Sequence, residues 1–71
     1  MVRIQFGAGN YKDVPNEGTL GNLLTDSVKQ EIALPSAGNI EYTLDGLTIN
    51  THQFLEHGDV VLCVQRAQEK G

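Results

Sequence analysis

Five consecutive apolar residues, at positions 60–64, place the strongest limit on how this chain of 71 residues can fold. Gly58 and Asp59 come directly before them, and such a pair is typical of the turn that leads into a strand. Because successive side chains of a strand point to opposite faces, the run is apolar on both faces. This pattern is typical of a strand at the centre of a sheet.

Two hairpins are predicted on either side of a helical segment. Apolar residues alternate at positions 2, 4 and 6, and the Gly-Ala-Gly-Asn sequence at 7–10 can reverse the chain into a short strand over 11–14, which Pro15 ends. Alternation returns at positions 40, 42 and 44 and is followed by Asp45-Gly46, the strongest hairpin signal in the chain. Apolar residues at 47 and 49 complete the second hairpin.

The segment between the hairpins predicts one amphipathic helix over residues 20–31. Apolar residues recur there at helical spacing, at Leu20, Leu23, Leu24 and Val28. Thr19 is a candidate N-cap, and Pro35 marks the latest point at which the helix can end. Because Gly21 weakens the first turn, packing of the leucine side must stabilise this helix.

The remaining segments carry weaker signals. Residues 50–58 show no clear periodicity, although Phe54 and Leu55 are expected to hold this loop against the core. The end of the chain is polar and lacks strand or turn signals, so we expect it to be flexible. The sequence therefore predicts one domain over 1–65 and a flexible tail over 66–71.

One helix and about five strands in a chain of this length predict an α+β fold, with the helix packed on a single mixed sheet. A first hairpin, a helical crossover and a central last strand beside the first strand describe the β-grasp arrangement. Three segments also resemble the ubiquitin-like superfamily, including the small bacterial modifiers and the sulfur carriers of thiamine and molybdopterin synthesis. They are the opening Val2-Arg3-Ile4-Gln5-Phe6, the helix start at 19–24 and the block at 55–64.

The resemblance implies a function for the end of the chain. In these carriers a similar Leu-x-x-Gly-Asp turn introduces the last strand, and a tail of comparable length ends in Gly-Gly; here the last two residues are Lys70 and Gly71. It implies that an ATP-dependent activating enzyme adenylates the Gly71 carboxylate and that a downstream transfer enzyme passes it to a target. Arg66 and Lys70 lie in the tail that would enter the partner. A processing peptidase is implied if the native gene runs past Gly71.

The resemblance also implies an orientation for the last strand. It places Val61 and Cys63 inward and leaves Leu62 and Val64 on the open side of the sheet, where an apolar pair is typical of a partner-binding patch. A second hypothesis is therefore a noncovalent β-grasp interaction module or accessory subunit that docks a larger enzyme. Neither hypothesis makes the chain an enzyme or requires a cofactor.

The charge and cysteine content of the chain limit the classes of partner and the compartment that we expect. Five basic and nine acidic residues give a net charge of −4, and the basic residues are scattered, which argues against nucleic acid and anionic membranes. A single cysteine cannot form an internal disulfide, and no apolar run is long enough to span a bilayer. We expect a cytoplasmic monomer.

Other reactive residues receive ordinary structural interpretations. Cys63 lies within the apolar run, which favours a buried, inert thiol, and His52 and His57 are expected on a solvated loop without the further ligands that zinc needs. The glycines at 7–9 lie between two strands, not before a helix, so a phosphate-binding loop is not expected.

No catalytic group is expected elsewhere. The hydroxyls and carboxylate at 25–27 have no candidate base nearby in the sequence, and a domain of this size has little room for a dry cleft. Glu41 and Asp45 are expected to be solvated and to protect a sheet edge. We predict neither a catalytic residue nor a metal site.

Overall fold

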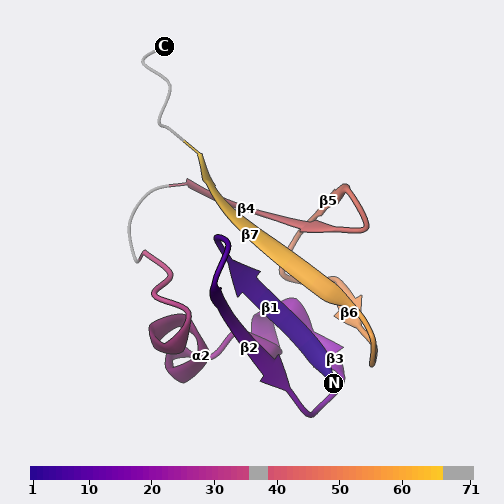
Figure 1. The fold of residues 1–71 in the computed structure, drawn as a ribbon. Coiled ribbons are helices and arrows are strands. Elements are labelled where there is room, and N and C mark those ends of the chain that lie inside the picture. The colour runs from indigo at the N-terminus through magenta and orange to yellow at the C-terminus, as the bar shows by residue number, and fades with distance from the viewer. Residues whose placement is uncertain (36–38, 67–71) are drawn as a thin grey trace.

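The computed structural model describes residues 1–35 and 39–66 and contains a mixed five-stranded sheet in the order β2-β1-β7-β4-β5 (Figure 1). Strands β1 and β7 pair in parallel, and the other neighbours are antiparallel. The apolar run therefore forms the central strand, as predicted. The strands are β1 (Val2–Phe6), β2 (Asn10–Val14), β4 (Asn39–Leu44), β5 (Leu47–Ile49) and β7 (Val60–Arg66).

Both predicted hairpins are present. The turn at 7–9 joins β1 to β2, with Gly7 at a φ of +74°. Asp45 and Gly46 join β4 to β5 with φ values of 54° and 82°. Two successive positive φ values are what the tightest hairpin turn requires, and aspartate and glycine tolerate them better than other residues.

The predicted single helix over 20–31 is wrong, because the chain forms two short helices, α1 (Leu20–Leu23) and α2 (Asp26–Glu31). The Thr19 hydroxyl accepts a hydrogen bond from the Asn22 backbone N–H at 3.3 Å, which confirms the predicted N-cap. The Thr25 hydroxyl accepts a second one from the Val28 N–H at 3.3 Å and begins α2. A new cap between the two helices replaces the continuous backbone ladder.

A second, two-stranded sheet lies beside the helices. It pairs β3 (Gly18–Thr19) with β6 (Phe54–Leu55), a contact that the sequence pattern did not predict. Leu55 is fully buried, as expected. Phe54 is 53% exposed, so the prediction that it also packs on the core is wrong.

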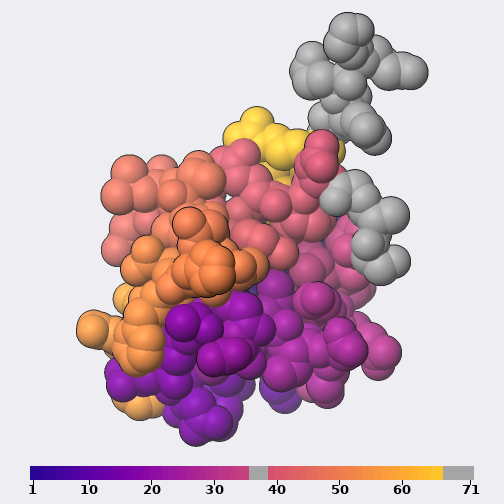
Figure 2. Space-filling model, turned by 180° about the vertical axis from the view of Figure 1, so that it is seen from behind, coloured from indigo at the N-terminus to yellow at the C-terminus, as the bar shows by residue number. Residues whose placement is uncertain are grey.

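The core lies between the sheet and the two helices. Figure 2, seen from behind, shows the purple segment around α1 and the orange segment around β6 packed side by side over this face. Gly21 allows α1 to lie close to the segment that precedes β6. Its N–H donates to the Thr51 carbonyl at 2.9 Å, and an added Cβ would lie 3.3 Å from that oxygen. The buried apolar residues are Val2, Ile4, Val14, Leu20, Leu23, Leu24, Val28, Ile32, Leu55, Val61 and Cys63.

The last strand is longer than the sequence pattern indicates. Strand β7 continues through Arg66, which pairs in register with Asn39 at the start of β4. The predicted tail over 66–71 therefore begins one residue too early, since Arg66 belongs to the sheet. The remaining tail residues, including Lys70 and Gly71, lie outside the described residues.

Candidate functional site

The side of the sheet that faces away from the helices carries an apolar stripe along its central strand. Val60, Leu62 and Val64 of β7 form this stripe and are 43%, 45% and 44% exposed. The alternate residues Val61 and Cys63 are 0% and 3% exposed. The predicted orientation of the strand is thus confirmed, with Leu62 and Val64 on the open side. We call this side the outer sheet face.

One flank of the apolar stripe is formed by the first hairpin. Arg3 and Asp13 are register partners on β1 and β2, and the Arg3 guanidinium donates to both carboxylate oxygens, at 2.8 and 3.3 Å. The guanidinium also lies 4.1 Å from the ring centroid of Tyr11, a cation–π distance. The hydrogen bond from Arg3 lowers the pKa of the Asp13 carboxyl below its ordinary value.

The other flank is formed by β4, β5 and the end of β7. The Glu41 carboxylate accepts hydrogen bonds from Arg66 at 2.7 Å and from the Thr48 hydroxyl at 2.9 Å. These bonds, the one from Arg66 first, lower the pKa of Glu41. Glu41 is therefore solvated only in part, and it joins three strands of the outer sheet face together.

The outer sheet face thus has an apolar centre and polar sides. Each flank contains one cation and one carboxylate already paired with each other. These pairs restrict the side chains of both flanks, and a group that is already ordered loses less freedom in any later contact. Alternate residues along a strand lie about 7 Å apart, which places the three apolar side chains along about 13 Å of surface.

The structure gives Cys63, His52 and His57 ordinary structural surroundings. Burial raises the pKa of the Cys63 thiol to about 11, which disfavours a reactive thiolate at neutral pH. His52 and His57 are exposed, and their backbone N–H groups are held by Asn50 and Glu17. Within residues 1–35 and 39–66, no three His, Cys, Asp or Glu side chains come together as metal ligands would.

The two charged flanks were not predicted from the sequence, although the sequence contains a signal for one of them. The turn at 7–9 has Arg3 and Gln5 on one side and Tyr11 and Asp13 at matching distances on the other. Mirror positions about a turn face each other across a hairpin, so the Arg3–Asp13 pair could have been predicted. The contact between Glu41 and Arg66 could not have been predicted, because the last strand was expected to end before Arg66.

Comparisons with family models, with curated proteins and with solved structures find no match for this chain. Among the helices that the structure describes, none is long and apolar enough to cross a membrane. Because no similar protein suggests a function, the functional proposal is based on the outer sheet face and its residues.

Proposed function

We propose that this chain is a ubiquitin-like protein-docking module that binds a partner protein through the outer sheet face. The observation that carries the proposal is the apolar stripe: three large aliphatic side chains on the central strand are each more than two-fifths exposed. Contiguous exposed apolar area is uncommon on small soluble domains and usually marks a binding surface.

The sheet order supports the ubiquitin-like interpretation. A first hairpin, a helical segment and a last strand inserted in parallel beside the first give the order β2-β1-β7-β4-β5, which is the order expected of a β-grasp domain. Such a domain keeps its helices on one side of the sheet and leaves the other side available. The architecture alone does not specify a partner, because one fold serves many functions.

The chemistry of the surface points to a protein as the occupant. Both cations on the flanks are neutralised by Asp13 and Glu41, so the described part of this surface offers no cluster of unpaired positive charge for a polyanion. A protein surface with an aliphatic or aromatic anchor at its centre and polar groups at its rim matches this pattern.

The test introduces arginine at one exposed leucine of the apolar stripe and, as a control, at another exposed leucine outside it. Leu62→Arg places a charge in the apolar stripe, whereas Leu47→Arg places the same charge on β5, where Leu47 is 71% exposed. Affinity capture from the source cells, quantified by mass spectrometry, should recover a partner with the wild type and with Leu47→Arg but lose it with Leu62→Arg. Equal recovery with both variants would exclude the apolar stripe as the docking surface.

A second candidate function is covalent activation of the Gly71 carboxylate by an ATP-dependent enzyme, followed by transfer to a target. The resemblance given above supports it, and five extended residues, the number between β7 and Gly71 with Gly71 included, can span about 17 Å. This function requires Gly71 to be the last residue of the mature protein, which an intact mass measurement on protein from the source cells would establish.

The two functions are separated by chemistry at the terminus. After incubation with ATP and a cognate activating enzyme, mass spectrometry should detect an adenylate, a thioester or a thiocarboxylate on Gly71 if the chain is a carrier. A variant lacking Gly71 provides the control. If that variant is activated as well as the wild type, the carrier function is excluded and the docking module remains.

A further inference from the structure

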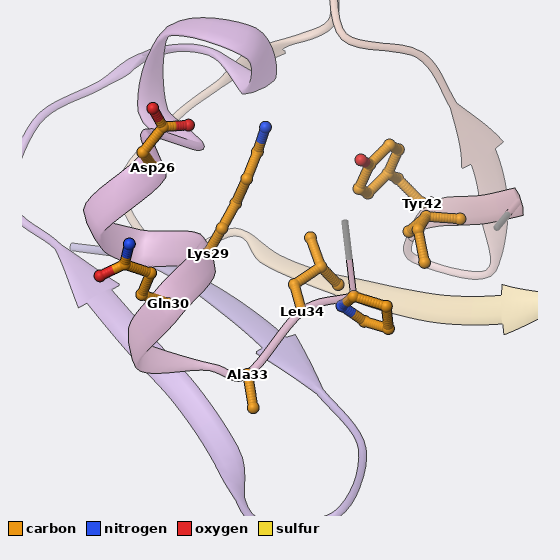
Figure 3. Close-up of a pocket in the computed structure, with 8 residues that line it drawn as sticks. Asp26, Lys29, Gln30, Ala33, Leu34 and Tyr42 are labelled. Carbon is orange, nitrogen blue, oxygen red and sulfur yellow. The ribbon is translucent and has the colours of Figure 1, made fainter. Parts of the chain in front are cut away.

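A cavity of about 540 Å³ lies between α2 and the beginning of β4, on the helix side of the sheet (Figure 3). Cavities that hold small ligands are commonly about 300 to 1,000 Å³. This cavity is on the opposite side of the sheet from the apolar stripe, since Ile40 and Tyr42 alternate with the outward Glu41. Its role is therefore separate from the proposed docking surface.

The end of α2 shapes the cavity. Ala33 adopts a φ of 58°, and the Leu34 N–H donates to the Lys29 carbonyl at 2.9 Å, which turns the chain sharply back at the helix end. This turn directs Leu34 and Pro35 into the cavity lining, where they join Ile40. Because the short α2 packs mainly against β2, the beginning of β4 is left partly uncovered.

The lining is half polar: Asp26, Lys29 and Gln30 of α2 and Tyr42 of β4 lie beside the apolar residues. Figure 3 shows the Lys29 side chain from α2 and the Tyr42 side chain from β4 extending towards one another. Within residues 1–35 and 39–66, Lys29 takes part in no ion pair, whereas Arg3, Lys12 and Arg66 each do. Burial raises the pKa of Tyr42, so its hydroxyl remains protonated and able to donate at neutral pH.

We propose that this cavity binds a small monocarboxylate with a branched aliphatic or aromatic body. The carboxylate would accept hydrogen bonds from the Lys29 ammonium and the Tyr42 hydroxyl, and the apolar body would pack on Leu34, Pro35 and Ile40. Asp26 also lines the cavity, and its carboxylate repels a second negative charge on the ligand. A phosphate is disfavoured for the same reason, and because one lysine without an arginine provides few of the donors that phosphate sites use.

The test is a titration followed by backbone amide NMR shifts, with isocaproate as the probe and isocaproamide as its neutral counterpart. Isocaproate should shift the amides of residues 26–34 and 40–42 and saturate with a Kd on the order of millimolar, as expected for so small a ligand. The neutral amide should bind about tenfold more weakly, because it lacks the charge-assisted bond to Lys29.

Matched charge variants determine whether Lys29 is responsible. Lys29→Gln should weaken isocaproate binding about tenfold and leave isocaproamide binding unchanged, whereas Lys12→Gln, on β2, should affect neither. Tyr42→Phe should weaken isocaproate binding and keep the fold, because only a hydroxyl is removed. The proposal is overturned if isocaproate shifts no amides around the cavity, or if Lys29→Gln binds it as tightly as Lys12→Gln does.

Discussion

Ala33 ends α2 in a backbone conformation that glycine adopts more readily. Its φ is 58°, its N–H donates to the Gln30 carbonyl at 3.1 Å, and the Leu34 N–H closes the outer bond of the same motif. A Cβ atom destabilises this left-handed position. Ala33→Gly should therefore raise the free energy of unfolding by about 0.5 to 1 kcal/mol, as measured by urea denaturation.

Ala8→Gly is the matched control for this prediction. Ala8 is exposed in the first turn and has no positive φ. Glycine there only increases the freedom of the unfolded chain, so a small loss of stability is expected. If both variants were equally destabilised, the left-handed conformation at Ala33 would not be a source of strain.

Two neighbouring residues of β7 should respond in opposite ways to the same substitution. Val61 is 0% exposed in the core, so Val61→Arg buries an unpaired charge and should unfold the domain. Leu62 is 45% exposed on the outer sheet face, so Leu62→Arg should change the free energy of unfolding by less than about 1 kcal/mol. Circular dichroism melts of the two variants distinguish these outcomes, and a folded Val61→Arg variant would contradict the assigned orientation.

Single residues could be predicted from the sequence where a repeating pattern fixed their orientation. Alternation within the last strand, with the family resemblance to set the parity, correctly separated Val61 and Cys63 from Leu62 and Val64. Phe54 and Leu55 had no such pattern, because a strand of two residues contains no repeat. Only one of two adjacent side chains can point inward, and the choice depended on pairing with Gly18 and Thr19.

At the scale of elements, the leucine pattern indicated helix correctly but could not show that it was divided. Leu20, Leu23, Leu24 and Val28 fit one continuous helix as well as two short ones. The signal that was missed is Thr25 followed by Asp26, a capping residue followed by an acidic first-turn residue. Leu24, between the helices, has a φ of −86° and a ψ of 71° and still buries its side chain.

The N-cap at Thr25 should contribute measurably to the free energy of unfolding. Thr25→Ala removes the hydroxyl that accepts the Val28 N–H at 3.3 Å, and a loss of about 1 kcal/mol is expected in urea denaturation. Thr25→Ser keeps the acceptor and should restore most of the loss. Ser27→Ala, at an exposed position within α2, should cost nothing. A Thr25→Ala variant as stable as Ser27→Ala would mean that packing alone positions α2.

For the whole molecule, the sequence predicted the five-stranded mixed sheet and its central strand because each strand carries a clear repeat or turn signal. The pairing of β3 with β6 was not predictable, since it joins two-residue segments that lie far apart in the chain. At the candidate site, the apolar stripe followed from alternation, whereas the flank around Glu41 required the exact register of three strands, β4, β5 and β7. Activation at Gly71 stays a prediction, because that residue lies outside the described part of the chain.

The acid sensitivity of the domain should arise in part from the two flanks of the outer sheet face. The pKa values of Asp13 and Glu41 are lowered from ordinary values of 3.8 and 4.5, chiefly by their hydrogen bonds to Arg3 and Arg66. A carboxyl whose pKa is lower in the folded state stabilises the fold above its unfolded pKa. That contribution is lost as the pH falls through the folded pKa.

Stability should therefore decrease as the pH falls from about 5 to about 3, over the window set by these two carboxyls. The double variant Asp13→Asn, Glu41→Gln should weaken this dependence, because neither neutral amide titrates, while stability at neutral pH should fall only slightly since both pairs are exposed to solvent. Asp45→Asn serves as control, because Asp45 belongs to no ion pair within the described residues and tolerates asparagine at its φ of 54°. Thermal melts between these pH values measure the slope. A double variant that loses stability in acid as steeply as Asp45→Asn would show that other groups set the acid limit of this fold.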